Sequence, residues 1–139
     1  MREGKIKVNQ GAMIKPQYQI FKSEANGSFE SQLTECLNRF QLFLETNPDQ
    51  KPFIARVFIA ANNQEQFSGR SKWIKEQQKV LNIPVSILAE APELPDLVLI
   101  EAGFVNSSGH RVEYGNAAGI SYCKIESSGY SEYWLAGVE

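Results

Sequence analysis

The sequence is poor in the residues that metal centres and nucleophilic catalysis require. It has two cysteines and one histidine among 139 residues. A zinc centre gathers several Cys or His ligands, and a serine or cysteine triad needs a histidine beside its nucleophile. Cys36 and Cys123 have no metal-like spacing. We therefore expect two buried free thiols in a reducing compartment, and neither a metal ion nor a cofactor.

Long apolar runs, glycine-rich phosphate loops and basic clusters are also missing. Without 18 consecutive apolar residues a membrane span is excluded, and the first eight residues do not lead into the apolar stretch of a signal peptide. The net charge is −2 with Lys and Arg dispersed, which argues against nucleic-acid binding. We expect a cytoplasmic protein whose 139 residues form one domain.

Two segments have the apolar spacing of amphipathic helices. In the first, apolar residues recur at helical intervals over residues 29–44, with Ser28 as a good N-cap and Pro48 as a stop signal. The second ends at Leu81 and is expected to begin between Gln64 and Ser71. Each helix therefore presents one apolar stripe to a core.

The remaining segments predict strands. Their apolar and β-branched runs are short and are bounded by turn residues. We expect a hairpin or two short strands near the amino terminus, and then an antiparallel meander that extends the main sheet at the carboxyl terminus. The expected strands are Lys5–Asn9, Gln17–Lys22, Pro52–Ala60, Ile83–Pro92, Leu97–Val105, Arg111–Tyr114, Ile120–Ile125 and Ser131–Leu135.

Charged residues inside apolar strands are the candidate functional groups. Glu101 interrupts an otherwise apolar run, and a carboxylate removed from water needs a partner or a function. Arg56 likewise places a charge among the apolar residues of its strand. An ion pair is a sufficient explanation for Glu101, and it remains open beside ligand contact.

The order of helices and strands, with Gln32-Leu33 on the first helix and Ile100-Glu101-Ala102 closing the last strand of the central region, resembles the Rid family. These are the YjgF-like, endoribonuclease L-PSP-like reactive-intermediate deaminases. The resemblance covers residues 28–105 and leaves 106–139 as a carboxyl-terminal β extension. It implies an α+β, chorismate-mutase-like mixed sheet backed by two helices, and a homotrimer with ligand clefts between subunits.

The departures from the family pattern bear on activity. Deaminating members carry an arginine and a second glutamate at places that fall on Pro84 and Leu99 here. Neither residue can clamp a carboxylate or move a proton. Ser86 stands where many relatives have a cysteine in the cleft, although it also suits a residue that faces a neighbouring strand.

Three hypotheses follow. The first is a Rid-like protein that binds a small metabolite without turning it over. The second is a hydrolase of small imines or enamines, in which the groups of a rebuilt cleft, among Glu101, Ser86, Arg56 and Arg111, act on a carbon–nitrogen bond. The third is an interaction module that presents the carboxyl-terminal strands to a partner. In the first two, these four residues are the expected ligand contacts.

Overall fold

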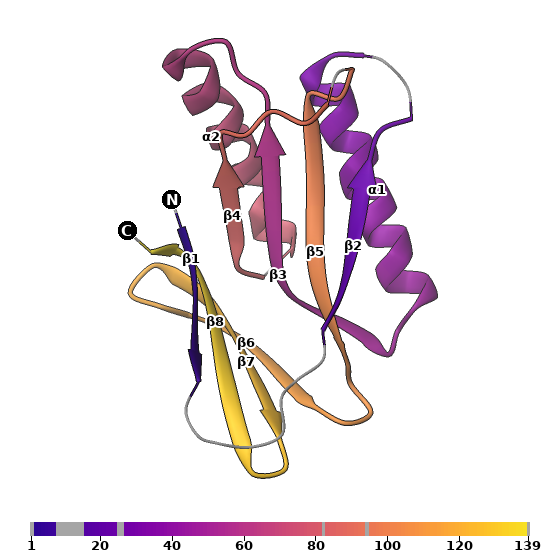
Figure 1. Ribbon diagram of the computed structural model, residues 1–139, viewed down its shortest axis with the longest axis vertical. Coiled ribbons are helices and arrows are strands. Elements are labelled where there is room, and N and C mark those ends of the chain that lie inside the picture. Colours follow the sequence, from indigo (N-terminus) through magenta and orange to yellow (C-terminus); the bar gives the residue numbers. More distant parts are fainter. Residues whose placement is uncertain (1, 8–15, 25–26, 82, 94, 139) are drawn as a thin grey trace.

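The computed structural model describes residues 2–7, 16–24, 27–81, 83–93 and 95–138, which form two helices and eight strands (Figure 1). The α+β class expected from the sequence is confirmed. The elements are β1 (Arg2–Lys7), β2 (Gln17–Lys22), α1 (Phe29–Thr46), β3 (Gln50–Ile59), α2 (Gln64–Leu81), β4 (Val85–Leu88), β5 (Val98–Asn106), β6 (Arg111–Ala117), β7 (Ile120–Ser127) and β8 (Tyr130–Val138).

The strands make two sheets of four strands each. The helix-backed sheet has the order β2-β5-β3-β4, and the second sheet has the order β1-β8-β7-β6. In the helix-backed sheet β3 and β4 are parallel, whereas β5 runs antiparallel to both β2 and β3. Figure 1 shows both helices on one side of this sheet and the second sheet at its lower end. The face away from the helices is therefore only partly covered.

Helix α1 begins and ends where its sequence signals predict. The Ser28 hydroxyl accepts a hydrogen bond from the Ser31 amide at 3.1 Å, as an N-cap does, and Asn47 caps the other end. Gln32 is buried on the inner face. Its side chain donates to the carbonyl of Pro95 at 3.3 Å and accepts from the amide of Leu97 at 2.8 Å. These bonds hold the start of β5 against the helix.

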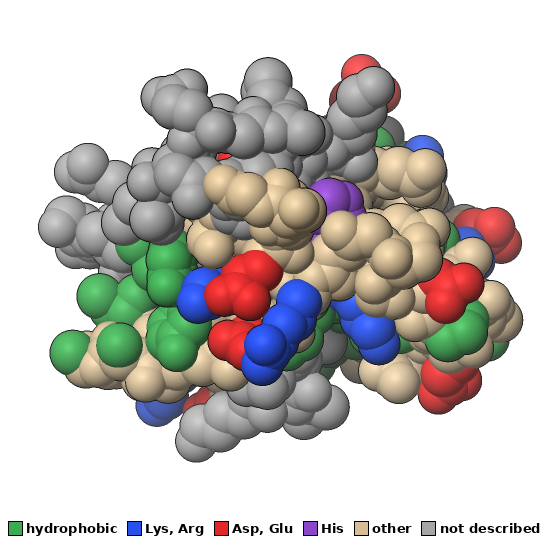
Figure 2. Space-filling view, turned by 90° about the horizontal axis from the view of Figure 1, so that it is seen from below, with side chains coloured by type: hydrophobic (Ala, Val, Ile, Leu, Met, Phe, Trp, Pro, Cys, Tyr) green, Lys and Arg blue, Asp and Glu red, His purple; other side chains and the backbone are tan. Residues whose placement is uncertain are grey.

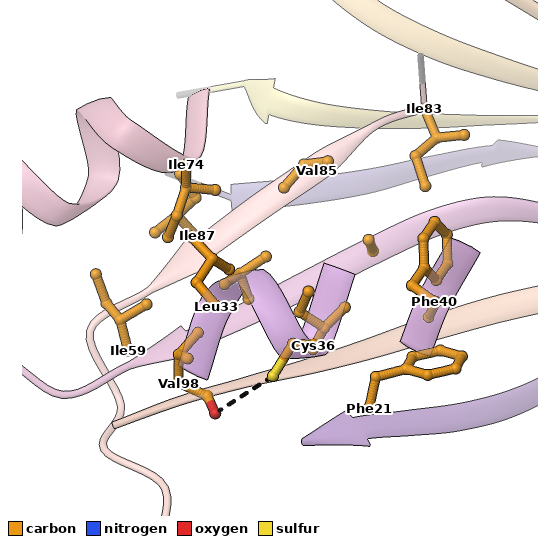
Figure 3. Packing of buried hydrophobic residues seen from close by; sticks show 14 of the residues in the cluster. Phe21, Leu33, Cys36, Phe40, Ile59, Ile74, Ile83, Val85, Ile87 and Val98 are labelled. Atoms are coloured by element: carbon orange, nitrogen blue, oxygen red, sulfur yellow. Dashed lines mark hydrogen bonds between the residues drawn. The ribbon is translucent and has the colours of Figure 1, made fainter. Parts of the chain in front are cut away.

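The main core lies between the helices and their sheet (Figure 3). Alternate residues of each strand point toward the helices, as the twofold period of a strand requires. Cys36 is buried in this core, and its thiol donates to the Val98 carbonyl at an S···O distance of 4.0 Å. The buried members include Phe21, Leu33, Phe40, Ala55, Val57, Ile74, Val85, Ile87, Ile100 and Phe104.

The prediction that the carboxyl-terminal meander extends the main sheet is wrong. Strands β6, β7 and β8 do pair in antiparallel succession, but they form the second sheet with β1. Cys123 and Ile125 of β7 pack in a separate small core against Phe53 and Ile54 of β3. Alternating apolar residues predict a strand with one buried face, but they do not specify which sheet the strand joins.

The two amino-terminal strands are separate and do not form a hairpin. Strand β1 pairs with β8 in the second sheet, whereas β2 pairs with β5 in the helix-backed sheet. Both expected strands therefore exist, with β1 over Arg2–Lys7 rather than from Lys5 onward. Residues 8–15 between them lie outside the described ranges.

Strand β3 contributes residues to both cores, and it has a β-bulge where it packs in the smaller one. Pro52 pairs with Phe104 and Ile54 pairs with Gly103, so Phe53 is an extra residue on β3. A bulge re-aims the side chains around it. Here both Phe53 and Ile54 are fully buried in the small core, and the Phe53 ring lies 4.6 Å from the Trp134 ring between centroids.

The face of the molecule that Figure 2 shows carries both positive and negative side chains. Lys and Arg side chains lie beside Asp and Glu side chains on that face. On the second sheet, Arg111 pairs with Glu113 at 2.6 Å and Lys124 pairs with Glu126 at 2.5 Å. Neither of the two described helices is apolar enough over its length to cross a membrane.

Candidate functional site

Three of the four predicted ligand contacts lie in one row across the helix-backed sheet. Arg56 on β3 is the register partner of Ser86 on β4 and of Glu101 on β5. Directly paired residues point to the same side of a sheet. Ala55 and Val57 face the helices, so Ser86, Arg56 and Glu101 face the opposite side. We call these three residues the polar row.

The two charged members of the row form an ion pair. Arg56 Nη1 donates to Glu101 Oε1 at 2.8 Å, and the two side chains are 22% and 29% exposed. Charge-assisted hydrogen bonds of this length are stronger than neutral ones, and partial burial reduces their screening by solvent. The carboxylate in the apolar strand therefore has the partner that the sequence requires.

An aromatic ring borders the guanidinium. Tyr18 on β2 lies with its ring centroid 5.6 Å from Arg56 Cζ, within the range of a cation–π contact. The space between Tyr18 and Phe53 exists because residue 103 is a glycine. A Cβ at Gly103 would stand 2.6 Å from Phe53 Cζ and 3.0 Å from Tyr18 Cε1. The backbone of β5 thus lets both rings approach the row.

Ser86 is the buried end of the row. It is 1% exposed, and its hydroxyl makes no hydrogen bond to any described residue. Strand β4 lies against β1 and β8 of the second sheet, which accounts for the burial. A buried polar group without a partner costs about 1–3 kcal/mol, so native proteins keep few of them. Among the described residues, this hydroxyl is the buried polar atom of the row that has no hydrogen-bond partner.

Arg111, the fourth predicted contact, is not brought to the row. It lies on β6 in the second sheet, its side chain is 73% exposed, and it pairs with Glu113 at 2.6 Å. Its register partner is Glu126 on β7, so acids flank it along and across the strands. This arrangement is that of a solvated surface charge.

The two departures from the Rid pattern lie beside the row. Leu99 points to the same face as Glu101, and its register partners are Phe58 on β3 and Lys22 on β2. Pro84 precedes β4, and its carbonyl accepts a hydrogen bond from the Ala55 amide at 2.9 Å. Neither position adds an acid or a cation to the row, although Lys22 is a near neighbour.

Other catalytic chemistry finds little support in the described residues. They contain no group of three or more His, Cys, Asp or Glu side chains that is arranged to hold a metal ion. Burial raises the pKa of Cys36 to about 11 and that of Cys123 to about 12. Because the thiolate is the reactive form, both thiols are poor nucleophiles at neutral pH.

Tyr18 is the site residue that sequence reasoning missed. The alternation of Gln17–Lys22 places Tyr18 and Ile20 on one face, which was a usable signal. The pairing of β2 with β5 was not predicted, and only that pairing brings Tyr18 toward Arg56. The orphaned hydroxyl of Ser86 had no sequence signal at all.

Three comparisons with known proteins, namely family models, curated proteins and solved structures, each gave no significant match to this chain.

Proposed function

We propose that this protein is a divergent Rid-like protein of chorismate-mutase-like fold that binds a small metabolite at the polar row. A neighbouring copy in a homotrimer completes the binding cleft. The observation that carries the proposal is the hydroxyl of Ser86, which lies beside the Arg56–Glu101 pair, is buried, and has no hydrogen-bond partner among the described residues. A ligand atom on this hydroxyl would remove the cost of leaving it unsatisfied.

The architecture supports this assignment. A mixed sheet with two helices on one face is what the Rid resemblance implies, and the polar row lies on the other face. That face is only partly covered, and Tyr18 and Ile20 are 42% and 59% exposed on β2. Exposed apolar side chains beside charged ones are common where a subunit or ligand binds. Two buried free thiols suit a cytoplasmic location.

Binding without turnover is favoured over hydrolysis. Imine hydrolysis needs a group that positions or activates water, and a positioned acid–base residue is worth about 10²–10⁴ in rate. Glu101 is engaged by Arg56, and the neighbouring position that would supply a second acid is Leu99. In this arrangement the carboxylate acts as an anchor for the guanidinium.

The chemistry of the row suggests the ligand class. A guanidinium donates to carboxylates, a carboxylate accepts from amino or hydroxyl groups, and a serine hydroxyl does both. The row therefore suits a small 2-amino, 2-hydroxy or 2-oxo carboxylic acid. Its apolar border, formed by Tyr18 and Ile20, suits a short aliphatic substituent on that acid.

The proposal is tested by calorimetric titration with L-serine, L-threonine and 2-oxobutanoate, together with light scattering for the oligomeric state. We expect binding by the trimer, and we expect Arg56→Met to weaken it by about tenfold or more, since a charged hydrogen bond contributes about 1.5–3 kcal/mol. Arg39→Ala is the matched control, because Arg39 lies on α1, away from the row. Equal affinities for the two variants would remove the row from the proposal.

Hydrolysis is the alternative outcome. Ammonia release from an imino acid, generated in the assay by an amino-acid oxidase, is measured with and without the protein. Background rates support the binding protein. Rates well above background that fall in Glu101→Gln would instead support a hydrolase with a rebuilt cleft.

The third hypothesis, an interaction module in the carboxyl-terminal strands, has less support. The inner face of these strands is occupied within the chain, because Cys123, Ile125 and Trp134 pack on Phe53 and Val105. These strands cover one end of the helix-backed sheet.

A further inference from the structure

The outer edge of β2, on the far side of this strand from β5, borders a groove that lies beside α1 and shares Ile20 with the border of the polar row. The groove has a volume of about 430 Å³ and lies between β2 and the carboxyl-terminal half of α1. Its lining residues are Ile20, Phe21, Lys22, Glu24, Arg39, Leu42, Phe43 and Thr46. It therefore has a strand as one wall and a helix as the other.

Exposed apolar side chains gather at this edge. The described structure leaves three large hydrophobic side chains exposed: Tyr18 at 42%, Ile20 at 59% and Leu42 at 58%. Two of them, Ile20 and Leu42, line the groove from its two walls. Single exposed apolar residues are common on protein surfaces, whereas their concentration at one site is typical of an interaction surface.

The backbone of β2 adds a second, independent feature. This strand is terminal in the helix-backed sheet and pairs with β5 on one side, and no described strand lies on the other side. A terminal strand presents unpaired amide and carbonyl groups that an added strand can use. An extended peptide that joins a sheet edge and packs against a neighbouring helix is a recurrent recognition mode.

The charged side chains that line the groove indicate what charge a bound segment should carry. Lys22 is exposed and makes no ion pair with a described residue, whereas Arg39 is shared between Glu24 at 3.2 Å and Glu35 at 3.8 Å. The lining thus has two cations against one acid, and the unpaired cation lies on the strand itself. An acidic side chain on the bound segment would complement Lys22.

We propose that this groove binds an extended segment of a partner protein, which adds a strand to β2. Aliphatic side chains of the segment contact Ile20 and Leu42, and an acidic side chain pairs with Lys22. Affinity comes from main-chain hydrogen bonds, and specificity comes from alternate side chains. The groove lies beside α1 and does not include Arg56, Ser86 or Glu101, but Ile20, the register partner of Glu101, borders both the groove and the polar row.

A random linear peptide library, displayed on phage and selected against the wild-type protein, tests the proposal. We expect enrichment of sequences that alternate aliphatic residues and contain Asp or Glu. The best peptide is then synthesised and measured by fluorescence polarisation. Its Kd should be on the order of 10 µM, and both Lys22→Glu and Leu42→Glu should raise it by about tenfold or more.

Three controls make the result specific. Lys72→Glu, on an exposed position of α2, and Arg56→Met should leave the Kd unchanged. Lys22→Gln removes the charge without reversing it and should give an intermediate Kd. A peptide methylated on alternate backbone nitrogens should lose binding, because strand addition needs those donors. Circular dichroism confirms that each variant is folded.

Several results would overturn the proposal. They are the absence of enriched peptides, an unchanged Kd in both Lys22→Glu and Leu42→Glu, or full retention of binding by the methylated peptide. Self-association that is lost in Leu42→Glu would assign the groove to a second copy of this chain instead.

Discussion

Arg56 on β3 and Glu101 on β5 are direct register partners, and their side chains meet at 2.8 Å on the face of the sheet that the helices leave uncovered. The two residues are 45 positions apart in the sequence. They meet because β5 lies between β2 and β3 and runs antiparallel to both. The pair is therefore a consequence of the sheet order. It supplies both charges of the row. Across the sheet, the pair lies between Ser86, which is buried, and Ile20, which is exposed.

The strength of this pair is measurable by a double-mutant cycle. Arg56→Met and Glu101→Met each remove one member of the ion pair and should lower the free energy of unfolding by about 1–3 kcal/mol. The double variant should be less destabilised than the sum of the two, with a coupling energy of about 1–2 kcal/mol. Urea unfolding provides the values. A coupling energy near zero would show that the contact between the two charges does not contribute to the free energy of unfolding.

Gly103 is predicted to be intolerant of any side chain. Gly103→Ala places a methyl group 2.6 Å from Phe53 Cζ, so the ring must move from its contact with Trp134. We expect a loss of about 1–3 kcal/mol, the usual cost of overpacking. Gly69→Ala on α2 is the matched control, since nothing lies within 4 Å of its added Cβ. It should stabilise the helix by about 0.5–1 kcal/mol. If the Tm of Gly103→Ala were equal to or higher than that of Gly69→Ala, the close packing of Phe53 against Gly103 would be contradicted.

The two thiols predict a loss of stability at alkaline pH. Burial raises the pKa of Cys36 to about 11 and that of Cys123 to about 12, from 9.0. Above about pH 9 the unfolded chain releases these protons while the folded chain keeps them, so stability falls as pH rises toward the folded pKa values.

Urea midpoints between about pH 7 and about pH 10.5 measure this effect. A Cys36→Ala/Cys123→Ala variant should show a shallower decline over the same range. Burial also raises the pKa of Tyr114, and Cys123 adds to that rise, so Tyr114 contributes to the decline in both proteins and less in the variant. Parallel pH profiles would show that the thiols do not cause the decline.

Arg111 is predicted to be dispensable. Its side chain is 73% exposed and its partner Glu113 lies on the same strand. Exposed ion pairs contribute about 0–1 kcal/mol, so Arg111→Ala should change neither the urea midpoint nor the calorimetric affinity beyond error. A loss of affinity comparable with that of Arg56→Met would place Arg111 in the ligand site after all, for example through a neighbouring subunit.

Local signals were sufficient for most of the elements. The stripe of residues 29–44, the Ser28 cap and the stop at Pro48 predicted α1 to within two residues of its observed end at Thr46. These signals depend on nearest neighbours along the chain, so one sequence contains them in full. Glu101 and Arg56 were identified as anomalous charges for the same reason, since each interrupts an apolar strand.

Such local signals do not predict which strands pair when the strands are far apart in the sequence. The meander was assigned to the wrong sheet, because its alternating residues fit any apolar surface, and the bulge at Phe53 supplies that surface on a second core. The contact of Tyr18 with Arg56 depends on β5 lying between β2 and β3. Register across three strands fixes the polar row, and no local pattern specifies it.

Ligand binding at the polar row is tested by titrating the wild-type protein with 2-oxobutanoate and following backbone amide resonances by nuclear magnetic resonance. We expect saturable shifts at Ser86, Arg56 and Glu101 and none at Arg111, and we expect these shifts to be lost in Arg56→Met. Resonances at the polar row that stay unchanged while another region shifts, or no saturable shift with any of the three small acids, would contradict ligand binding at the polar row.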